Sequence, residues 1–147
     1  MKLTDALLGE HGALYALFAQ VEACVARAAT AGEARLLVAV IAPLVLAHAT
    51  LEDELLLPAI EARTGATPLL AVMREEHEEI AGSLAAASAA EDRAAVIAHL
   101  RDAVETARSH FAKEEGALFP LAEECLDARE LGRLGALWAN ARGVRAA

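Results

Sequence analysis

Residues 48–58 read HATLEDELLLP, and residues 110–120 read HFAKEEGALFP. The two stretches share a histidine, a glutamate four residues later, an acidic residue directly after that glutamate, and a leucine and a proline at the same later offsets. Because residues four apart lie on the same face of an α-helix, each stretch predicts a helix that presents a histidine beside a glutamate. This repeated pair determines how we interpret the rest of the chain.

A glutamate followed by a histidine also recurs ahead of each stretch, as Glu10-His11 in the first half and Glu76-His77 in the second. The halves therefore resemble two copies of one helical hairpin, related by an approximate two-fold axis. Such an axis suits a site that contains two similar metal ions.

Apolar residues recur at helical spacing in four long segments and one short one. We expect helices over about 4–29, 33–63, 68–87 and 91–126, and a short fifth helix over about 129–141. The connections are short, so neighbouring helices should run antiparallel. The fold prediction is an all-α, up-down-up-down four-helix bundle (about 3–126) with a short C-terminal helix, in a single domain spanning 1–147.

Three details of these helices are also predicted. Thr4 is a plausible N-cap for the first helix. The second helix carries an apolar stripe that includes Leu44, and Pro43 should kink or split it because proline removes one helical hydrogen bond. Gly116 and Pro120 should weaken the last third of the fourth segment.

The composition limits the classes of function. The chain has 147 residues, of which 56% are hydrophobic and only 3% aromatic, which favours one domain of aliphatic, alanine-rich helices. The formal net charge is −9 and the pI is about 5.0. An acidic protein repels phosphate backbones, so we expect no nucleic acid partner.

The same residues bear on the compartment. Cys24 and Cys125 form no Cys-x-x-Cys motif and fit a reducing compartment. Asp5, Glu10 and His11 interrupt any apolar signal segment. The longest uncharged apolar run, 36–47, is shorter than the ~20 residues that span a bilayer. We expect a cytoplasmic protein without a membrane partner.

Six residues fall on or beside the apolar stripes of their segments: His11, His48, Glu52, His77, His110 and Glu114. Burying an ionised carboxylate is costly unless a cation compensates it, and a pair of divalent metal ions would do so. Imidazole combined with carboxylate suits iron, manganese or zinc. If both glutamates bridge, each metal receives two oxygens and two nitrogens from the protein. A bridging oxide or hydroxide then leaves roughly one open position on a six-coordinate iron.

The order of these residues resembles the hemerythrin-like (HHE cation-binding) domain family. The pattern reads His11, then His48-Ala-Thr-Leu-Glu52, then His77, then His110-Phe-Ala-Lys-Glu114, and the resemblance covers roughly 3–124. It implies a non-haem di-iron site, with oxo or hydroxo and carboxylate bridges, that binds oxygen or a related small molecule such as peroxide or nitric oxide.

One departure from the family pattern matters. Oxygen-carrying hemerythrins have a second histidine one turn from the third-helix histidine, whereas Met73 and Ala81 stand at that distance from His77. An extra open position would make oxygen binding less reversible and favour redox turnover. Tyr15 lies one turn beyond His11, and our hypothesis is that it binds the cofactor, filling the vacant position or hydrogen-bonding a bound ligand.

Several functions therefore stay open at this point. The protein is a di-iron oxygen, redox or nitric oxide sensor or store, or a di-iron enzyme with peroxidase-like, catalase-like or nitric oxide reductase activity, or a protein of iron handling or iron-sulfur repair. It is a monomer or a homodimer. His99, about 16 Å from His110 along the helix axis, is interpreted as structural or solvent-facing. Glu10 and Glu76 are interpreted as surface charges, and Trp138 as an anchor of the terminal helix.

Overall fold

The computed structural model describes residues 1–144. Within them the chain forms helices and turns and no strand. The elements in chain order are α1 (Leu3–Val25), α2 (Ala31–Leu51), η1 (Glu52–Leu56), α3 (Leu57–Thr64), α4 (Pro68–Ala89), α5 (Arg93–Lys113), η2 (Glu114–Leu118), α6 (Phe119–Cys125) and α7 (Ala128–Ala141), where η marks a π-helical turn.

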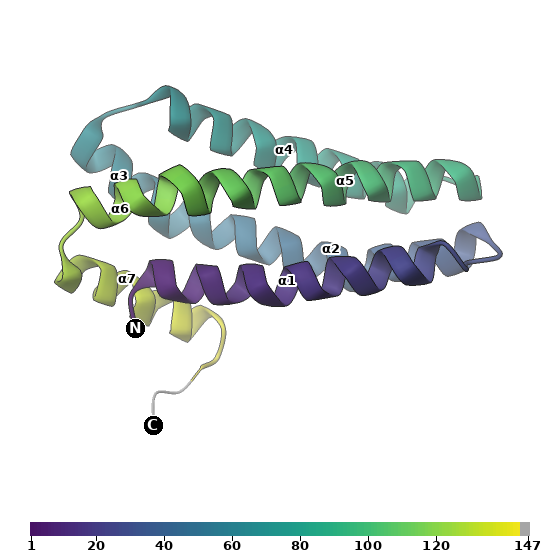
Figure 1. Cartoon of the computed structure of the whole chain (residues 1–147), viewed down its shortest axis with the longest axis horizontal. Coiled ribbons are helices and arrows are strands. Elements are labelled where there is room, and N and C mark those ends of the chain that lie inside the picture. The colour runs from purple at the N-terminus through teal and green to yellow at the C-terminus, as the bar shows by residue number, and fades with distance from the viewer. Residues whose placement is uncertain (145–147) are drawn as a thin grey trace.

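The helices form an up-down-up-down bundle, as the short connections predicted (Figure 1). The hairpin of α1 and α2 packs against the hairpin of α4 and α5, and α3 and α6 continue the lines of α2 and α5 at one end. The short α7 folds back beside the start of α1. The predicted fold class is confirmed, including the C-terminal helix.

Side-chain caps fix where most helices begin. Thr30, Thr67, Asp92 and Asp127 each accept a hydrogen bond from the backbone N–H three residues later, at the starts of α2, α4, α5 and α7. The predicted cap at Thr4 is wrong: α1 already begins at Leu3, after Lys2. The buried Thr4 hydroxyl instead donates to Glu123 at 2.7 Å, which ties α1 to α6.

Two π-helical turns interrupt the long helices, and each begins at a glutamate of the repeated motif. The N–H of Leu57 donates to the Glu52 carbonyl and that of Phe119 to the Glu114 carbonyl, both five residues back. A proline follows directly in each case, and it has no N–H to continue the ordinary ladder. Such turns occur often at functional sites. By contrast α2 runs through Pro43 without the predicted split.

Two apolar clusters fill the bundle, one at each end. The first contains Phe18, Ile41, Leu100 and Phe111, and the second contains Leu3, Leu7, Ile60, Leu70 and Leu118. Along α1 the order is Leu7, His11, Leu14, which places His11 between the clusters. The polar residues of the motif are thus enclosed by apolar packing on both sides.

The predicted stripe of α2 is partly wrong. Leu36, Val40 and Leu44 share an outer face and are 68%, 53% and 51% exposed. The continuous helix Ala31–Thr64 is also long and apolar enough, by length and composition alone, to cross a membrane. A bundle helix that carries buried histidine and glutamate can meet the same criterion, so this finding is weak evidence for a membrane span.

Candidate metal centre

The four main helices bring all six sequence-predicted side chains together. His11 comes from α1, His48 from α2 and Glu52 from the turn after it, His77 from α4, and His110 with Glu114 from α5 and its following turn. Every one of the six is buried; both glutamates are 0% exposed and His77, the least buried, is 7% exposed. The sequence patterning therefore placed each of them correctly in the core.

The inward atoms lie close to one another. His48 Nε2 is 3.4 Å from Glu52 Oε1, and His77 Nε2 is 3.3 Å from Glu52 Oε2. His110 Nε2 is 3.1 Å from Glu114 Oε1, and His11 Nε2 is 3.2 Å from Glu114 Oε2. Each glutamate thus offers one oxygen to each half of the bundle.

These inward atoms lack ordinary hydrogen bonds. Among residues 1–144, both carboxylate oxygens of Glu52 and of Glu114, and the Nε2 atoms of His77 and His110, are buried without a hydrogen-bond partner. The Nε2 atoms of His11 and His48 lie 3.1 Å apart and face each other. Buried polar atoms are rarely left unpaired, because each costs about 1–3 kcal/mol. The donor set fits a cation, which would satisfy all of these atoms at once.

The atoms fall into two groups of metal-ligand spacing. One contains His11, His48, Glu52 and Glu114, and the other contains His77, His110 and the same two glutamates. Each group therefore offers two nitrogens and two oxygens, with both glutamates shared. This is the ligand count that the sequence predicted for two bridging carboxylates.

A second ring of carboxylates surrounds the histidines. His48 Nδ1 lies 2.7 Å from Glu10 and His110 Nδ1 lies 2.9 Å from Glu76. His77 Nδ1 lies 3.0 Å from Asp53, and His11 Nδ1 lies 2.9 Å from Glu115. The pairs follow the internal repeat. Glu10 and Glu76, each directly before a histidine, bond the histidine of the next helix in the same half. Asp53 and Glu115, each directly after a motif glutamate, bond a histidine of the opposite half.

The outer ring sets the tautomer of each imidazole. A carboxylate can only accept, so each Nδ1 carries a proton and donates it, and Nε2 is the atom that faces inward and would bind a cation. Carboxylate partners of this kind orient metal-binding histidines and raise their basicity. Burial lowers the pKa of His48, but Glu52 and Glu10 outweigh it and raise that pKa to about 10. The pKa of about 10 means that the metal-free His48 ring keeps a second proton at neutral pH, which a bound cation would displace.

The hemerythrin HHE cation-binding domain is described by a sequence model that matches residues 2–122. The chain belongs to this family. No curated protein and no solved structure gives a significant match. The family and the buried His/Glu cluster together support a non-haem iron-binding protein. Of the elements described above, α7 lies outside the region matched to the family.

Our interpretation of Glu10 and Glu76 as surface charges is wrong. Both are partly buried and each bonds a histidine of the hemerythrin-like centre. Their recurrence directly before a histidine was the available signal. A glutamate directly before a histidine points about 100° away from it around the helix axis. The glutamate therefore bonds a histidine on a neighbouring helix, and spacing along one helix does not predict that pair.

The remaining candidates lie around the centre. Tyr15 is half-buried, with its ring 6.4 Å from the His11 ring between centroids. Burial and the nearby Glu115 carboxylate raise the pKa of Tyr15, so its hydroxyl stays protonated. The histidine left over, His99, is half-buried on α5 and belongs to neither ligand group. Trp138 does anchor α7, by donating from Nε1 to Glu10 at 3.1 Å.

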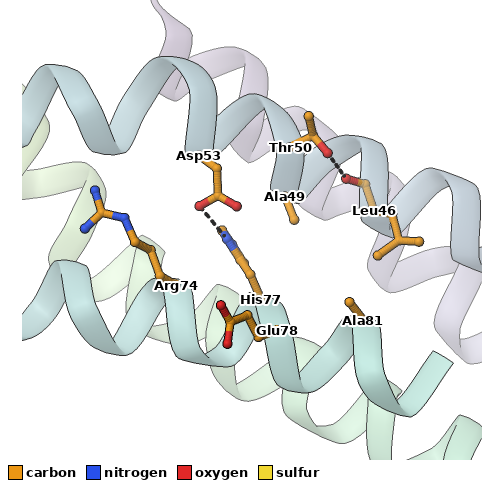
Figure 2. Close-up of a pocket in the computed structure, with 8 residues that line it drawn as sticks. All are labelled: Leu46, Ala49, Thr50, Asp53, Arg74, His77, Glu78 and Ala81. Atoms are coloured by element: carbon orange, nitrogen blue, oxygen red, sulfur yellow. Dashed lines mark hydrogen bonds and ion pairs between the residues drawn. The ribbon is translucent and has the colours of Figure 1, made fainter. Parts of the chain in front are cut away.

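The positions one turn from His77, where oxygen-carrying hemerythrins have a further histidine, are apolar in this chain. Met73 is fully buried in the end cluster that also contains Leu70. Ala81 lines a surface cavity of about 350 Å³ beside His77, and Figure 2 shows His77 directed toward Asp53 between the walls of this cavity. Neither side chain supplies a nitrogen ligand to the hemerythrin-like site.

Proposed function

We propose that the chain is a di-iron protein that binds oxygen or a related small molecule, in storage or sensing. His11 and His48 would hold one iron and His77 and His110 the other, with Glu52 and Glu114 shared between the two groups. The observation that carries this proposal is the contrast between the two faces of each imidazole. The outer nitrogens are all hydrogen-bonded to carboxylates, whereas the four inner nitrogens converge with the four carboxylate oxygens. Among residues 1–144, the four oxygens and the Nε2 atoms of His77 and His110 have no hydrogen-bond partner.

Iron suits this donor set because the ligands are imidazole and carboxylate, without thiolate. When bound, iron supplies open coordination positions and a reversible redox couple. The chain's own residues orient the ligands and exclude water. Phe111 stacks on His11 with ring centroids 4.0 Å apart, and the apolar clusters close the site from both ends.

The small molecule approaches from the His77 side. His77 is the most exposed of the six residues, and the cavity beside it is lined by Ala49 and Ala81, which leave room for a diatomic molecule or peroxide. The cavity also contains Asp53 and Arg74. Because Asp53 accepts a hydrogen bond from His77 Nδ1, the His77 ring keeps its orientation while a ligand passes beside it.

A second function, turnover of peroxide, is favoured by one observation. Neither Met73 nor Ala81 contributes a ligand, so the iron at His77 has one protein ligand fewer than in an oxygen carrier of this family. A less saturated iron favours reaction over reversible binding. We keep peroxidase-like activity as the alternative to storage or sensing, and the cytoplasmic location as a prediction.

The test begins with the metal. Protein purified without oxygen is analysed for iron, manganese and zinc by mass spectrometry, and absorption spectra are recorded in the reduced and oxidised states. We expect about two irons per chain and charge-transfer bands that depend on oxidation. The His99→Ala variant is the matched control, because it removes a histidine outside both ligand groups. Protein without metal, after reconstitution with ferrous iron has also failed, would overturn the proposal.

Adding oxygen or peroxide to the reduced protein then separates the two functions. A spectrum that reverses when oxygen is removed supports binding. Oxidation of the reduced protein, followed by consumption of many equivalents of peroxide per chain, supports the enzyme.

A further inference from the structure

The Glu10 carboxylate is held by three different side chains. Its Oε2 accepts from His48 Nδ1 at 2.7 Å and from Arg142 Nη2 at 3.0 Å. Its Oε1 accepts from Arg142 Nε at 2.6 Å and from Trp138 Nε1 at 3.1 Å. Two of these side chains belong to α7 and the residue after it, which lie beyond the region matched to the family.

The equivalent carboxylate in the other half is held differently. Glu76 accepts from His110 Nδ1, and within residues 1–144 its other partner is Lys113, on the same helix as His110. The Lys113 side chain is 43% exposed, whereas that of Arg142 is 25% exposed. A flexible lysine makes a weaker constraint than a two-pronged guanidinium, whose planar shape fixes a carboxylate in orientation.

We propose that α7, through Arg142 and Trp138, is a positioning element for one half of the metal centre. It holds Glu10 where that carboxylate fixes the His48 ring, and so makes the His11/His48 group retain its metal longer than the His77/His110 group. This inference rests on the proposed di-iron function. It also gives the two metals different roles. The metal of the His11/His48 group is retained more firmly, and the metal of the His77/His110 group binds small molecules.

The charges around Glu10 support this arrangement. The Glu10 side chain is 18% exposed, and the Arg142 guanidinium forms an ion pair with it at 2.6 Å. The carboxylate is therefore ionised and accepts from both sides. Arg142 also lines a cavity of about 280 Å³ beside His48, together with Leu17 and Leu44.

The docking of α7 has a feature that allows a remote test. Gly135 lies against the N-terminus, and a Cβ added there would come within 2.4 Å of the Met1 carbonyl oxygen. That oxygen is backbone, so an alanine at this position would push α7 away from α1. Gly132, one turn earlier on the same helix, has no neighbour within 4 Å of an added Cβ.

The first measurement is iron release to a chelator, followed by absorption in wild type and variants. We expect two phases in wild type, the slower from the His11/His48 group. Arg142→Ala and Gly135→Ala should accelerate the slower phase by about 10–100-fold, the usual effect of losing a partner of a metal-binding histidine, and leave the faster phase unchanged. Arg142→Lys should restore part of the effect, and Gly132→Ala should behave as wild type. Lys113→Ala should act on the faster phase alone.

The second measurement needs no metal. Proton exchange at His48 Nδ1 and His110 Nδ1 is followed by nuclear magnetic resonance in metal-free protein. Arg142→Ala should speed exchange at His48 and leave His110 unchanged. Arg142→Ala with unchanged iron release and unchanged His48 exchange would overturn the role of α7 while the di-iron proposal stands. Wild type that never binds iron would overturn the di-iron proposal and the metal-retaining role with it, whatever the exchange rates show.

Discussion

The two halves of the bundle contain the same ligands but are closed to different degrees. On the α1/α2 side, His11 and His48 are 0% and 1% exposed, and His48 borders a cavity of about 280 Å³. Arg142, directly after α7, holds the Glu10 carboxylate that accepts from His48. On the α4/α5 side, His77 is 7% exposed and faces a cavity of about 350 Å³. The internal repeat thus produced two similar ligand groups, and an element outside the repeat made them unequal.

This difference shows how one centre can separate stability from reactivity. In the proposed centre, Arg142 fixes Glu10, the outer partner of His48, and would therefore make the first metal more firmly held. The proposed metal at His77 lies beside a cavity and lacks a further histidine, so it would accept another ligand. Removing a residue that both halves share tests whether they form one centre, and changing each half alone tests whether the two metals differ.

The largest effect should follow loss of a shared carboxylate. Glu52→Ala removes one oxygen from each ligand group, so we expect loss of at least one iron and loss of the stability that the metals confer. Breaking a buried charged cluster costs about 3–5 kcal/mol, which corresponds to a Tm lower by roughly 6–20 °C for a chain of this size. Metal analysis and calorimetry measure both effects.

Glu54→Ala is the matched control for this prediction, because Glu54 lies in the same π-helical turn but is exposed. Full iron occupancy in Glu52→Ala would show that the carboxylate is not a shared ligand.

A smaller, one-sided effect should follow loss of a histidine. His77→Ala leaves the His11/His48 group complete, so iron content should fall from about two to about one per chain, and reactivity with oxygen should be lost with it. His11→Ala should remove the other iron. Rapid-freeze Mössbauer spectra of the two variants should therefore show different single sites. Identical spectra would contradict the separation of the centre into two halves.

The sequence predicted the burial of the six inner His and Glu side chains correctly, for a simple physical reason. His48 and Glu52, like His110 and Glu114, interact along one helix, where spacing fixes the geometry. Apolar residues at the same periodicity then show that these polar groups face the core. The bundle itself followed from the same patterns, since a few long amphipathic segments with short connections allow few arrangements.

The outer ring could not be predicted in the same way. Glu10 and His48, or Glu76 and His110, meet across different helices, and their pairing depends on the rotation and offset of one helix against another. The contacts of Arg142 are harder still, because they depend on where a short terminal helix docks. The exposed stripe containing Leu44 was missed because an apolar surface position and an apolar core position look alike in a periodic sequence.

The outer carboxylates should give intermediate effects that compare the halves directly. Glu10→Gln and Glu76→Gln keep the shape of the side chain but remove its charge, so each should weaken one metal by about 10–100-fold. Glu10→Gln should have the larger effect, because it also leaves Arg142 without its ionic partner. Competition with a chelator measures the two affinities, and Glu75→Gln, at an exposed position, is the control. Equal losses in the two variants would argue against the special role of the first half.

The smallest effect should come from Tyr15, which lies on the closed side. Its hydroxyl is protonated and near Glu115, the carboxylate that holds His11, so it supports the outer ring or a bound ligand through a single hydrogen bond. Such a bond contributes about 0.5–1.5 kcal/mol, or between about two- and ten-fold in peroxide reactivity. Tyr15→Phe retains the ring contacts with His11 and Phe111 and removes only the hydroxyl. A shifted absorption spectrum with both irons retained would place Tyr15 among the residues that act on the centre, whereas an unchanged spectrum together with unchanged reactivity would make it packing alone. The cavity beside His77 measures about 350 Å³ and the one beside His48 about 280 Å³. A strong effect of Tyr15→Phe would show that small molecules reach the His11/His48 half as well, which is the outcome that would most alter the comparison.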